Sequence, residues 1–225
     1  MKKILILAPH ADDEILGCGG TIHKYKKLGY QIHIVILTNA NIGDEELFSK
    51  NLIKKIRKEA YNANKILNIK NLIFYDLPAP RLDQYPIYKI ANLIEKIFKQ
   101  IKPDTVFIPS EKDMHFDHKI INNAAMIAAR PINKNNIKRI FAYETLSETH
   151  WGVCFNKPFS PNYFEILNEE NIKFKKKSFQ QYKSQLKKFP HPRSVKGVVT
   201  LANFRGMQIN SQYAEAFEVK LYLNH

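Results

Sequence analysis

The side chains best suited to chemistry lie in residues 9–14, with the sequence PHADDE. His10 and Asp13 are three residues apart, and a turn that enters a helix can bring such side chains to one side. Zn²⁺ binds imidazole nitrogen and carboxylate oxygen readily, and catalytic zinc usually keeps three protein ligands and one open position for water. Residues 9–14 therefore supply two candidate zinc ligands, and a third must come from elsewhere in the chain.

The third ligand is expected from residues 114–118, with the sequence MHFDH. Either His115 or His118 can complete the metal site, and the other can stabilise an oxyanion and protonate the leaving amine. Asp117 can support one of these histidines. A carboxylate beside the metal, but not bound to it, must take the proton from water, and Asp12 is the candidate for this general base. Together the two clusters predict metal-assisted hydrolysis of an amide.

Each cluster taken alone has a simpler interpretation. Two aspartates at the start of a helix are common caps, and short patterns of histidine and aspartate also arise by chance. Both clusters follow an apolar stretch that is expected to form a buried strand, and this joint occurrence favours the metal site. Most other histidines, including His23, His33 and His225, are interpreted as structural or solvated.

The elements that must position these clusters alternate between strand and helix. Short apolar runs are typical of strands buried on both faces of a parallel sheet, and they occur at residues 4–8, 32–38, 72–75 and 105–109. Helical spacing of apolar residues predicts helices over residues 15–28, 52–67 and 90–101. This pattern predicts an α/β fold, a Rossmann-like and mostly parallel sheet with helices on both faces, which binds ligands at the carboxyl ends of its strands.

The pattern weakens from about Trp151, where several prolines interrupt it. One helix is expected over residues 169–188 and a last strand over residues 214–223. Since no repeat or low-complexity linker separates this part, the sequence favours a single domain over residues 1–225, with residues 151–225 as an extension that shapes the pocket.

Three glycines follow the first acidic cluster, but they do not form a dinucleotide-binding loop, because the GxGxxG spacing fails. Gly17, Gly19 and Gly20 are better interpreted as sites where a helix packs closely on the sheet, with Cys18 as a small core residue. Cys18 and Cys154 are far apart and form no metal-binding pattern. A reducing cytoplasm is the expected location, since neither a signal peptide nor a membrane span is recognisable.

The net charge of +14 and pI near 9.6 favour acidic partners such as phosphates, nucleic acid or anionic lipid. The alternative is that a composition rich in lysine reflects background residue usage, with the lysines on solvated helix faces.

Residues 8–14 (APHADDE) and 17–21 (GCGGT) resemble the opening motif of the PIG-L/LmbE-like zinc-dependent N-acetylglucosaminyl deacetylase family. Residues 115–118 (HFDH) resemble its second motif. Further stretches resemble the family in order along nearly the whole chain: residues 57–60, 142–145, 182–185, 205–206 and 213–217. The chain departs from the family pattern at Ala11 and Phe116, where proline is usual; this frees φ at both turns but removes no ligand.

The resemblance implies an LmbE-like deacetylase fold and resolves the open roles of the two histidines. By this resemblance His10, Asp13 and His118 bind Zn²⁺ and Asp12 is the general base. His115 then acts at the oxyanion and leaving nitrogen, and Asp117 orients His115.

Six further side chains are candidate substrate contacts. Arg57, His191 and Arg193 can meet a phosphate or hydroxyl groups, although an ion pair of Arg57 with a nearby carboxylate is an equal alternative. Tyr143, Glu144 and Trp151 are further pocket candidates, for which a core role is equally open.

The expected function is zinc-dependent removal of the N-acetyl group from an N-acetylated amino sugar or its conjugate, with or without a phosphate group. A related amidase that acts on a thiol conjugate or an acylated antibiotic-type precursor is an alternative, since the ligands report the reaction and not the acyl acceptor. A basic nucleic-acid-binding module is disfavoured because the acidic cluster would repel phosphates. Peripheral contact with a membrane stays open.

Overall fold

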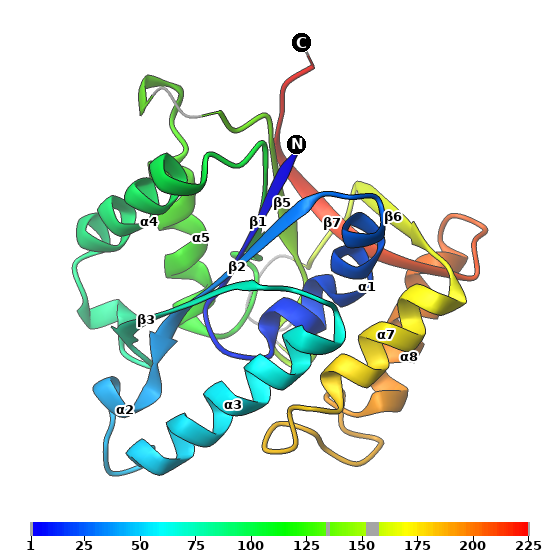
Figure 1. The fold of residues 1–225 in the computed structure, drawn as a ribbon, viewed down its shortest axis with the longest axis horizontal. Coiled ribbons are helices and arrows are strands. Elements are labelled where there is room, and N and C mark those ends of the chain that lie inside the picture. The colour runs from blue at the N-terminus through cyan, green and yellow to red at the C-terminus, as the bar shows by residue number, and fades with distance from the viewer. Residues whose placement is uncertain (1, 134–135, 152–157, 225) are drawn as a thin grey trace.

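The computed structural model describes residues 2–133, 136–151 and 158–224 of the 225-residue chain, so Cys154 and His225 lie outside the described residues. Seven strands form one sheet in the order β3-β2-β1-β4-β5-β7-β6 (Figure 1). Neighbouring strands from β3 to β5 are parallel, and β7 is antiparallel to both of its neighbours. The strands are β1 (Lys3–Ala8), β2 (Gln31–Asn39), β3 (Asn71–Pro78), β4 (Thr105–Pro109), β5 (Arg139–Tyr143), β6 (Tyr163–Leu167) and β7 (Tyr213–Tyr222).

Helices cover both faces of the sheet because the apolar strands present side chains in both directions. Ile4 and Ile6 of β1 belong to one core with the first, third and seventh helices, whereas Leu5 and Leu7 belong to the other core with the fourth and fifth. The helices are α1 (Asp13–Lys27), α2 (Ala40–Gly43), α3 (Lys50–Ile66), α4 (Ile87–Ile101), α5 (Phe116–Ala128), α6 (Glu148–Trp151), α7 (Glu169–Phe179) and α8 (Val195–Met207), with short 3-10 turns at Leu82–Gln84 and Pro131–Asn133. The Rossmann-like α/β fold is therefore confirmed.

Strands β1 and β4 are neighbours in the sheet, but the helices that follow them cover opposite faces. This arrangement is a topological switch point, where open α/β sheets bind ligands beyond the carboxyl ends of the strands. Residues 9–13 follow β1, and residues 110–118 follow β4 into α5. Both clusters predicted from the sequence therefore emerge at the same edge of the sheet.

The glycines of α1 allow the close packing that the sequence predicts. A Cβ atom at Gly17 would lie 2.3 Å from Cδ2 of Tyr143, and one at Gly20 would lie 2.4 Å from Cδ1 of Leu167. Cys18 between them is buried and forms no disulfide. The start of α1, which carries Asp13, is thus held firmly against the sheet.

The carboxyl-terminal third corrects one expectation, and it contains α8, one of two longer helices that the sequence does not predict. The helix expected over residues 169–188 ends at Phe179, because the chain turns so that Tyr182 enters the core and its hydroxyl donates to Glu14. The sequence analysis also predicts neither α5 nor α8. The last strand, expected over residues 214–223, forms as β7 (Tyr213–Tyr222). Within the described ranges, no helix has both the length and the apolar composition needed to cross a bilayer.

Candidate active site

Three donor atoms meet at the carboxyl ends of β1 and β4. The separations are 3.4 Å between His10 Nδ1 and Asp13 Oδ2, 3.3 Å between His118 Nε2 and Asp13 Oδ2, and 3.3 Å between His118 Nε2 and His10 Nδ1. The edge of a tetrahedron with zinc–ligand bonds of about 2.0–2.1 Å measures about 3.3 Å. These donors also have the nitrogen and oxygen chemistry that zinc accepts, so residues His10, Asp13 and His118 fit such an ion.

Local structure holds each of the three donors in place. The Oδ2 atom of Asp13, the first residue of α1, accepts a hydrogen bond of 2.8 Å from the backbone N–H of His10. His118 lies in the first turn of α5 and is fully buried, as is Asp13. The Oδ1 atom of Asp13 is buried without a hydrogen-bond partner among the described residues. A buried carboxylate with unused acceptor capacity is what a bound cation would satisfy.

Carboxylates lie behind both imidazoles of the donor triad, which consists of His10, Asp13 and His118. The distance from His10 Nε2 to Asp117 Oδ2 is 3.0 Å, and that from His118 Nδ1 to Asp113 Oδ2 is 2.7 Å. The hydroxyl of Thr149 donates to the other oxygen of Asp113. Such carboxylates fix the ring orientation of a metal ligand and raise its basicity.

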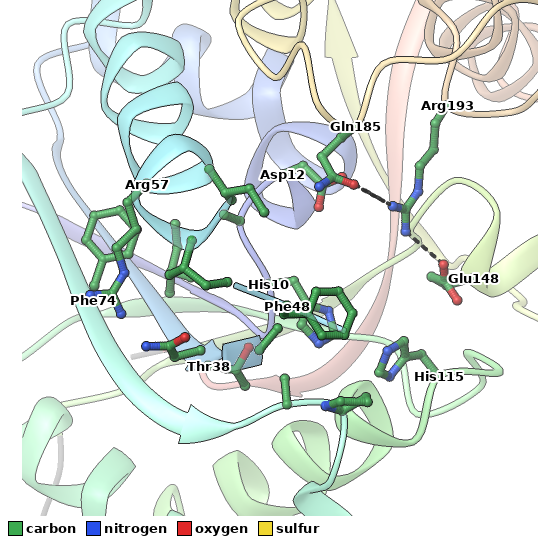
Figure 2. A pocket seen from close by; sticks show the side chains of 18 residues that line it. His10, Asp12, Thr38, Phe48, Arg57, Phe74, His115, Glu148, Gln185 and Arg193 are labelled. Atoms are coloured by element: carbon green, nitrogen blue, oxygen red, sulfur yellow. Dashed lines mark hydrogen bonds and ion pairs between the residues drawn. The ribbon is translucent and has the colours of Figure 1, made fainter. Parts of the chain in front are cut away.

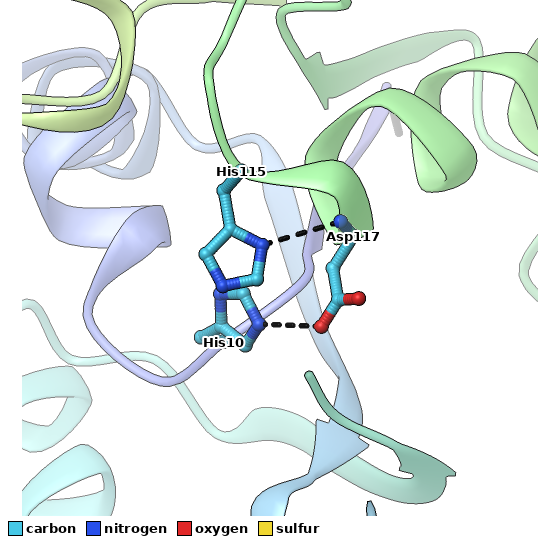
Figure 3. A group of neighbouring side chains, drawn as sticks. All are labelled: His10, His115 and Asp117. Carbon is cyan, nitrogen blue, oxygen red and sulfur yellow. Dashed lines mark hydrogen bonds and ion pairs between the residues drawn. The ribbon is translucent and has the colours of Figure 1, made fainter. Parts of the chain in front are cut away.

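The structure corrects the partner that the sequence assigns to Asp117. Its carboxylate contacts His10, not His115, while its backbone N–H donates to His115 Nδ1 over 3.2 Å (Figure 3). The reason is that His115 is the N-cap of α5, so its ring meets a backbone donor of the first turn. His10, His115 and Asp117 form a second grouping of possible ligands, in which His10 Nε2 and Asp117 Oδ2 already form a pair 3.0 Å apart.

The hydrogen bond to Nδ1 determines the chemistry of His115. Because Nδ1 accepts, the neutral ring carries its hydrogen on Nε2 and can donate from that atom. Burial, together with the charges of His10 and His118, lowers the pKa of His115 to about 3. His115 is thus a neutral hydrogen-bond donor at the cavity wall.

Asp12 lies beside the three donors and makes no cap. Its side chain forms no capping hydrogen bond to α1, so the capping interpretation does not apply to it. Its Oδ2 atom lies 3.5 Å from Nη1 of Arg193 and has no hydrogen bond among the described residues. Burial raises the pKa of Asp12 to about 7, and its backbone φ of 120° is strained for a residue with a side chain. Strain and a perturbed pKa are typical of functional sites.

The charges of the triad depend on one another. Burial would lower the pKa of His10, but hydrogen bonds with Asp117 and Asp13 outweigh it and raise this pKa to about 9. Burial would also lower the pKa of His118. The charge of Asp13 and the hydrogen bond with Asp113 outweigh burial and raise this pKa well above its usual value. Asp13, despite burial, has its pKa held well below the usual range by His118 and His10.

A cavity of about 330 Å³ opens beside these groups (Figure 2). His10, Asp12 and His115 form one side of the cavity, with Glu148, Gln185 and Arg193 at the same end. Thr38, Asn39 and Arg57 also line the cavity, and apolar side chains from β2, β3 and the α3 region line much of the rest: Ile36, Phe48, Ile53, Ile56 and Phe74. A cavity with a few convergent polar groups and an otherwise apolar wall is the usual form of a small-molecule site.

Comparison with known proteins agrees with this geometry. Residues 5–129 match the PIG-L family model, described as GlcNAc-PI de-N-acetylase. The chain belongs to the PIG-L family. The match confirms the resemblance drawn from the sequence motifs, and it covers both clusters of the site. The chain is accordingly an enzyme of a deacetylase family that hydrolyses an amide bond.

Individual relatives extend the PIG-L likeness along the chain. An uncharacterized deacetylase of Escherichia coli K12 is 29% identical over 187 residues, which covers 81% of this chain and 91% of the relative. The diacetylchitobiose deacetylase of Thermococcus kodakarensis is 24% identical, over 96% of this chain and 82% of the relative. A crystal structure of a conserved protein from Thermus thermophilus has a TM-score of 0.77 at 26% identity, covering 100% of this chain and 97% of that chain.

Two of the six predicted substrate contacts line the cavity of this PIG-L family member. Arg57 lies on the apolar side, where Nη2 donates to Asp76 and the guanidinium carbon lies 5.0 Å from the Phe74 ring centroid. Arg193 donates from Nε to Ser147 over 3.0 Å and from Nη2 to Glu148 over 2.8 Å. Arg57 therefore forms the ion pair that the sequence offered as an alternative, with Asp76 as its partner, and it lines the cavity as well.

The other four contacts do not line the cavity. Tyr143 is fully buried, packs on Gly17, and donates its hydroxyl to the carbonyl of Leu7, so its role is in the core. Glu144 is also buried and binds Arg205 through both oxygens, which leaves it unavailable to substrate. For these two side chains the contacts favour the core role that the sequence left open, because each side chain is satisfied inside the protein.

Trp151 and His191 contact each other near the site, with ring centroids 5.2 Å apart. Half of the surface of Trp151 is exposed, and His191 Nδ1 accepts the backbone N–H of Arg193 over 3.0 Å. His191 therefore helps to position Arg193, and neither ring lines the cavity itself.

Several functional side chains were not predicted. Asp113, Glu148 and Thr149 act through contacts with other site residues, which no local pattern reveals. Asp113 had one signal, since it lies five residues before His118 in the same acidic and histidine-bearing stretch. Helix α5 also had a signal, because its buried residues Ile121, Ala124, Ala125 and Ala128 have helical spacing.

Proposed function

We propose that this chain is a zinc-dependent hydrolase that removes the N-acetyl group from an N-acetylated amino sugar. The observation that carries the proposal is the triangle of donor atoms from His10, Asp13 and His118, which has the dimensions of one face of a zinc tetrahedron. Asp12 and His115 line the adjoining cavity, at positions suited to a base and an oxyanion donor. The likeness to the diacetylchitobiose deacetylase of Thermococcus kodakarensis supports an N-acetylated sugar as substrate.

Zinc held by His10, Asp13 and His118 would supply an activated water molecule and polarise the amide carbonyl. Asp12 takes a proton from the attacking water and delivers it to the departing nitrogen. The resemblance gives this last step to His115, but a His115 with a lowered pKa is neutral and serves as a hydrogen-bond donor instead. The unpartnered Oδ2 atom of Asp12 is free to accept this proton, and Arg193 at 3.5 Å holds the carboxylate in position.

His115 stabilises the negative charge that develops on the carbonyl oxygen. It donates from Nε2 because Nδ1 is engaged by the Asp117 backbone. Asp117 and Asp113 hold the two ligand imidazoles in position. Each role uses a contact that is already formed, so little reorganisation is needed when the charge develops.

The substrate is proposed to occupy the cavity, with Arg57 and Arg193 as contacts for hydroxyl or phosphate oxygens. Gln185 and Arg193 support the proposal that residues 151–225 shape the pocket, and strands β6 and β7 in the common sheet support a single domain. A buried free thiol at Cys18 is in keeping with the proposed cytoplasmic location.

Acetate release is the direct test of this proposal. Purified protein is stripped with a chelator, reloaded with zinc, and incubated with N-acetylglucosamine, its phosphate and nucleotide conjugates, a thiol conjugate and an acylated antibiotic-type precursor. We expect one bound zinc and acetate release from at least one N-acetylated sugar. Release from the thiol or antibiotic-type compound alone would favour the related amidase. Full zinc loading with no amide cleaved in the panel would argue against the proposal.

A further inference from the structure

The positive charge of the molecule is concentrated in two segments that pack together. Helix α3 (Lys50–Ile66) and residues 169–196, which include α7, hold fifteen basic and three acidic side chains. They therefore carry +12 of the net charge of +14 in one fifth of the chain. Background lysine usage would spread the charge evenly, so this distribution calls for another explanation.

The two segments border the cavity from neighbouring sides. Ile53, Ile56 and Arg57 of α3 line it, and so do Gln185 and Arg193 of residues 169–196. Both segments lie on the sheet face covered by α1, opposite to α4 and α5 (Figure 1). The basic face, defined as the exposed lysines of α3 and residues 169–196, thus adjoins the candidate active site.

Most of these basic side chains form no ion pair with the described residues of the protein. Of the fifteen basic residues, Arg57, Lys175 and Arg193 form ion pairs. The other twelve are lysines without an ion pair to any described residue. Lys50, Lys54, Lys58 and Lys65 follow one another at intervals of four and seven residues, so they line one side of α3. An unpaired row of like charges is mildly destabilising, so an anionic partner would relieve it.

Exposed apolar side chains lie among these lysines. The exposed fractions are 72% for Leu47, just before α3, and 56% each for Tyr61 and Phe189. Lysines interspersed with apolar and aromatic side chains are typical of surfaces that bind anionic membranes. The exposed Glu45 and Glu46, before α3, mark the limit of the basic face.

Nucleic acid fits the same surface less well. The basic face consists of lysines, whereas arginine is the main reader of base edges, and the two arginines of these segments, Arg57 and Arg193, line the cavity instead. Lys196 Nζ lies 4.2 Å from the centroid of the Phe189 ring, so one face of this exposed ring is already covered and only the other could stack on a base.

We propose that the basic face docks on an anionic lipid surface, which places the neighbouring cavity beside that surface. Lysines supply the attraction, and Leu47, Tyr61 and Phe189 enter the headgroup region. The partner class is a lipid bilayer with anionic headgroups.

Vesicle sedimentation tests the proposal with the full chain. The probes are vesicles of phosphatidylcholine alone and vesicles of equimolar phosphatidylcholine and phosphatidylglycerol. The variant carries Lys54→Glu, Lys58→Glu and Lys187→Glu, and the control carries Lys89→Glu, Lys96→Glu and Lys99→Glu on α4, the opposite face. Each exchange changes the charge by two, so both proteins fall from +14 to +8.

We expect binding to the anionic vesicles that weakens with salt and is absent for phosphatidylcholine. Each lysine lost from the basic face should lower the partition coefficient about fivefold, so the variant should lose far more binding than the control. Equal losses in variant and control would show that only net charge matters and would overturn the proposal. Tight binding of a single-stranded oligonucleotide by protein that binds neither kind of vesicle would also overturn the proposal. Since no turnover is measured, either result leaves the hydrolase proposal standing.

Discussion

Asp12 combines burial, an unpartnered carboxylate oxygen and a nearby guanidinium, all at the wall of the cavity. The Asp12→Asn substitution keeps the shape of the side chain but removes its basicity. We expect the variant to bind zinc as the parent does and to lose about 10²- to 10⁴-fold in turnover. Zinc content by elemental analysis and acetate release check both parts, with the exposed Asp83→Asn as control. Undiminished turnover would remove Asp12 from the role of base.

The raised pKa values of His10 and His118 give the site a defined pH dependence. With no ion bound, His10 has a pKa of about 9 and is protonated at neutral pH. Zinc must displace this proton, so zinc affinity should fall by about tenfold per pH unit for each proton released as pH drops below 9. Calorimetry in buffers of different ionisation enthalpy counts the protons. Zinc binding at pH 7 without proton release would contradict this account of the triad.

Helix α6 (Glu148–Trp151) connects several parts of the site although it has only four residues. Glu148 binds Arg193, Thr149 binds Asp113 behind His118, a proposed zinc ligand, and His150 pairs with Glu144. The Thr149 hydroxyl also accepts the Thr145 backbone N–H over 2.7 Å. Side chains far from the cavity can thus influence the orientation of a metal ligand.

Replacing the Thr149 hydroxyl tests this connection. Thr149→Val keeps the volume but leaves Asp113 Oδ1 without its donor, so zinc affinity should fall by about tenfold, the lower end of the range for outer-shell partners. Thr149→Ser keeps the hydroxyl and should bind zinc as the parent does. Competition with a fluorescent chelator measures both affinities. The connection is refuted when valine and serine variants bind zinc equally well.

Helix α1 positions Asp13 through its contact with β5. The Cβ of an alanine at Gly17 would meet the Tyr143 ring at 2.3 Å, and Tyr143 is too buried to move away freely. Gly17→Ala should therefore lower the free energy of unfolding by about 1–3 kcal/mol. Urea denaturation measures the loss. Tyr143→Leu removes the ring that the new methyl group would meet. The double variant Gly17→Ala/Tyr143→Leu should therefore lose less free energy of unfolding than the sum of the two single losses. Additive effects would show that the contact is not the cause.

Elements with a strong local pattern were predictable from sequence. The apolar run at residues 105–109 matches β4, and the others lie within a few residues of β1, β2 and β3. The end of α7 was not predictable, because the residues after Phe179 have a helical pattern. The helix ends there because Tyr182 turns into the core and donates a hydrogen bond to Glu14, which is distant in sequence. The same limit explains the contact between Asp113 and Thr149, which lie 36 residues apart in the sequence.

At the scale of the whole molecule, the sheet order brings together residues that are about one hundred positions apart. His10 follows β1 and His118 follows β4, and these strands are neighbours only because the chain crosses to β2 and β3 first. The motifs indicated the ligands, but the enclosing wall of Glu148, Gln185 and Arg193 arises from packing of the carboxyl-terminal third. Sequence patterns therefore indicated which polar side chains lie together better than they indicated the surroundings of these side chains.

Anomalous diffraction at the zinc absorption edge, on crystals of the zinc-loaded protein, tests the central claim most directly. We predict one strong peak about 2.0–2.2 Å from His10 Nδ1, His118 Nε2 and a carboxylate oxygen of Asp13. A fourth position should face the cavity beside Asp12 and His115. A fully loaded protein with its zinc peak elsewhere, or with no peak among these three residues, would contradict the account.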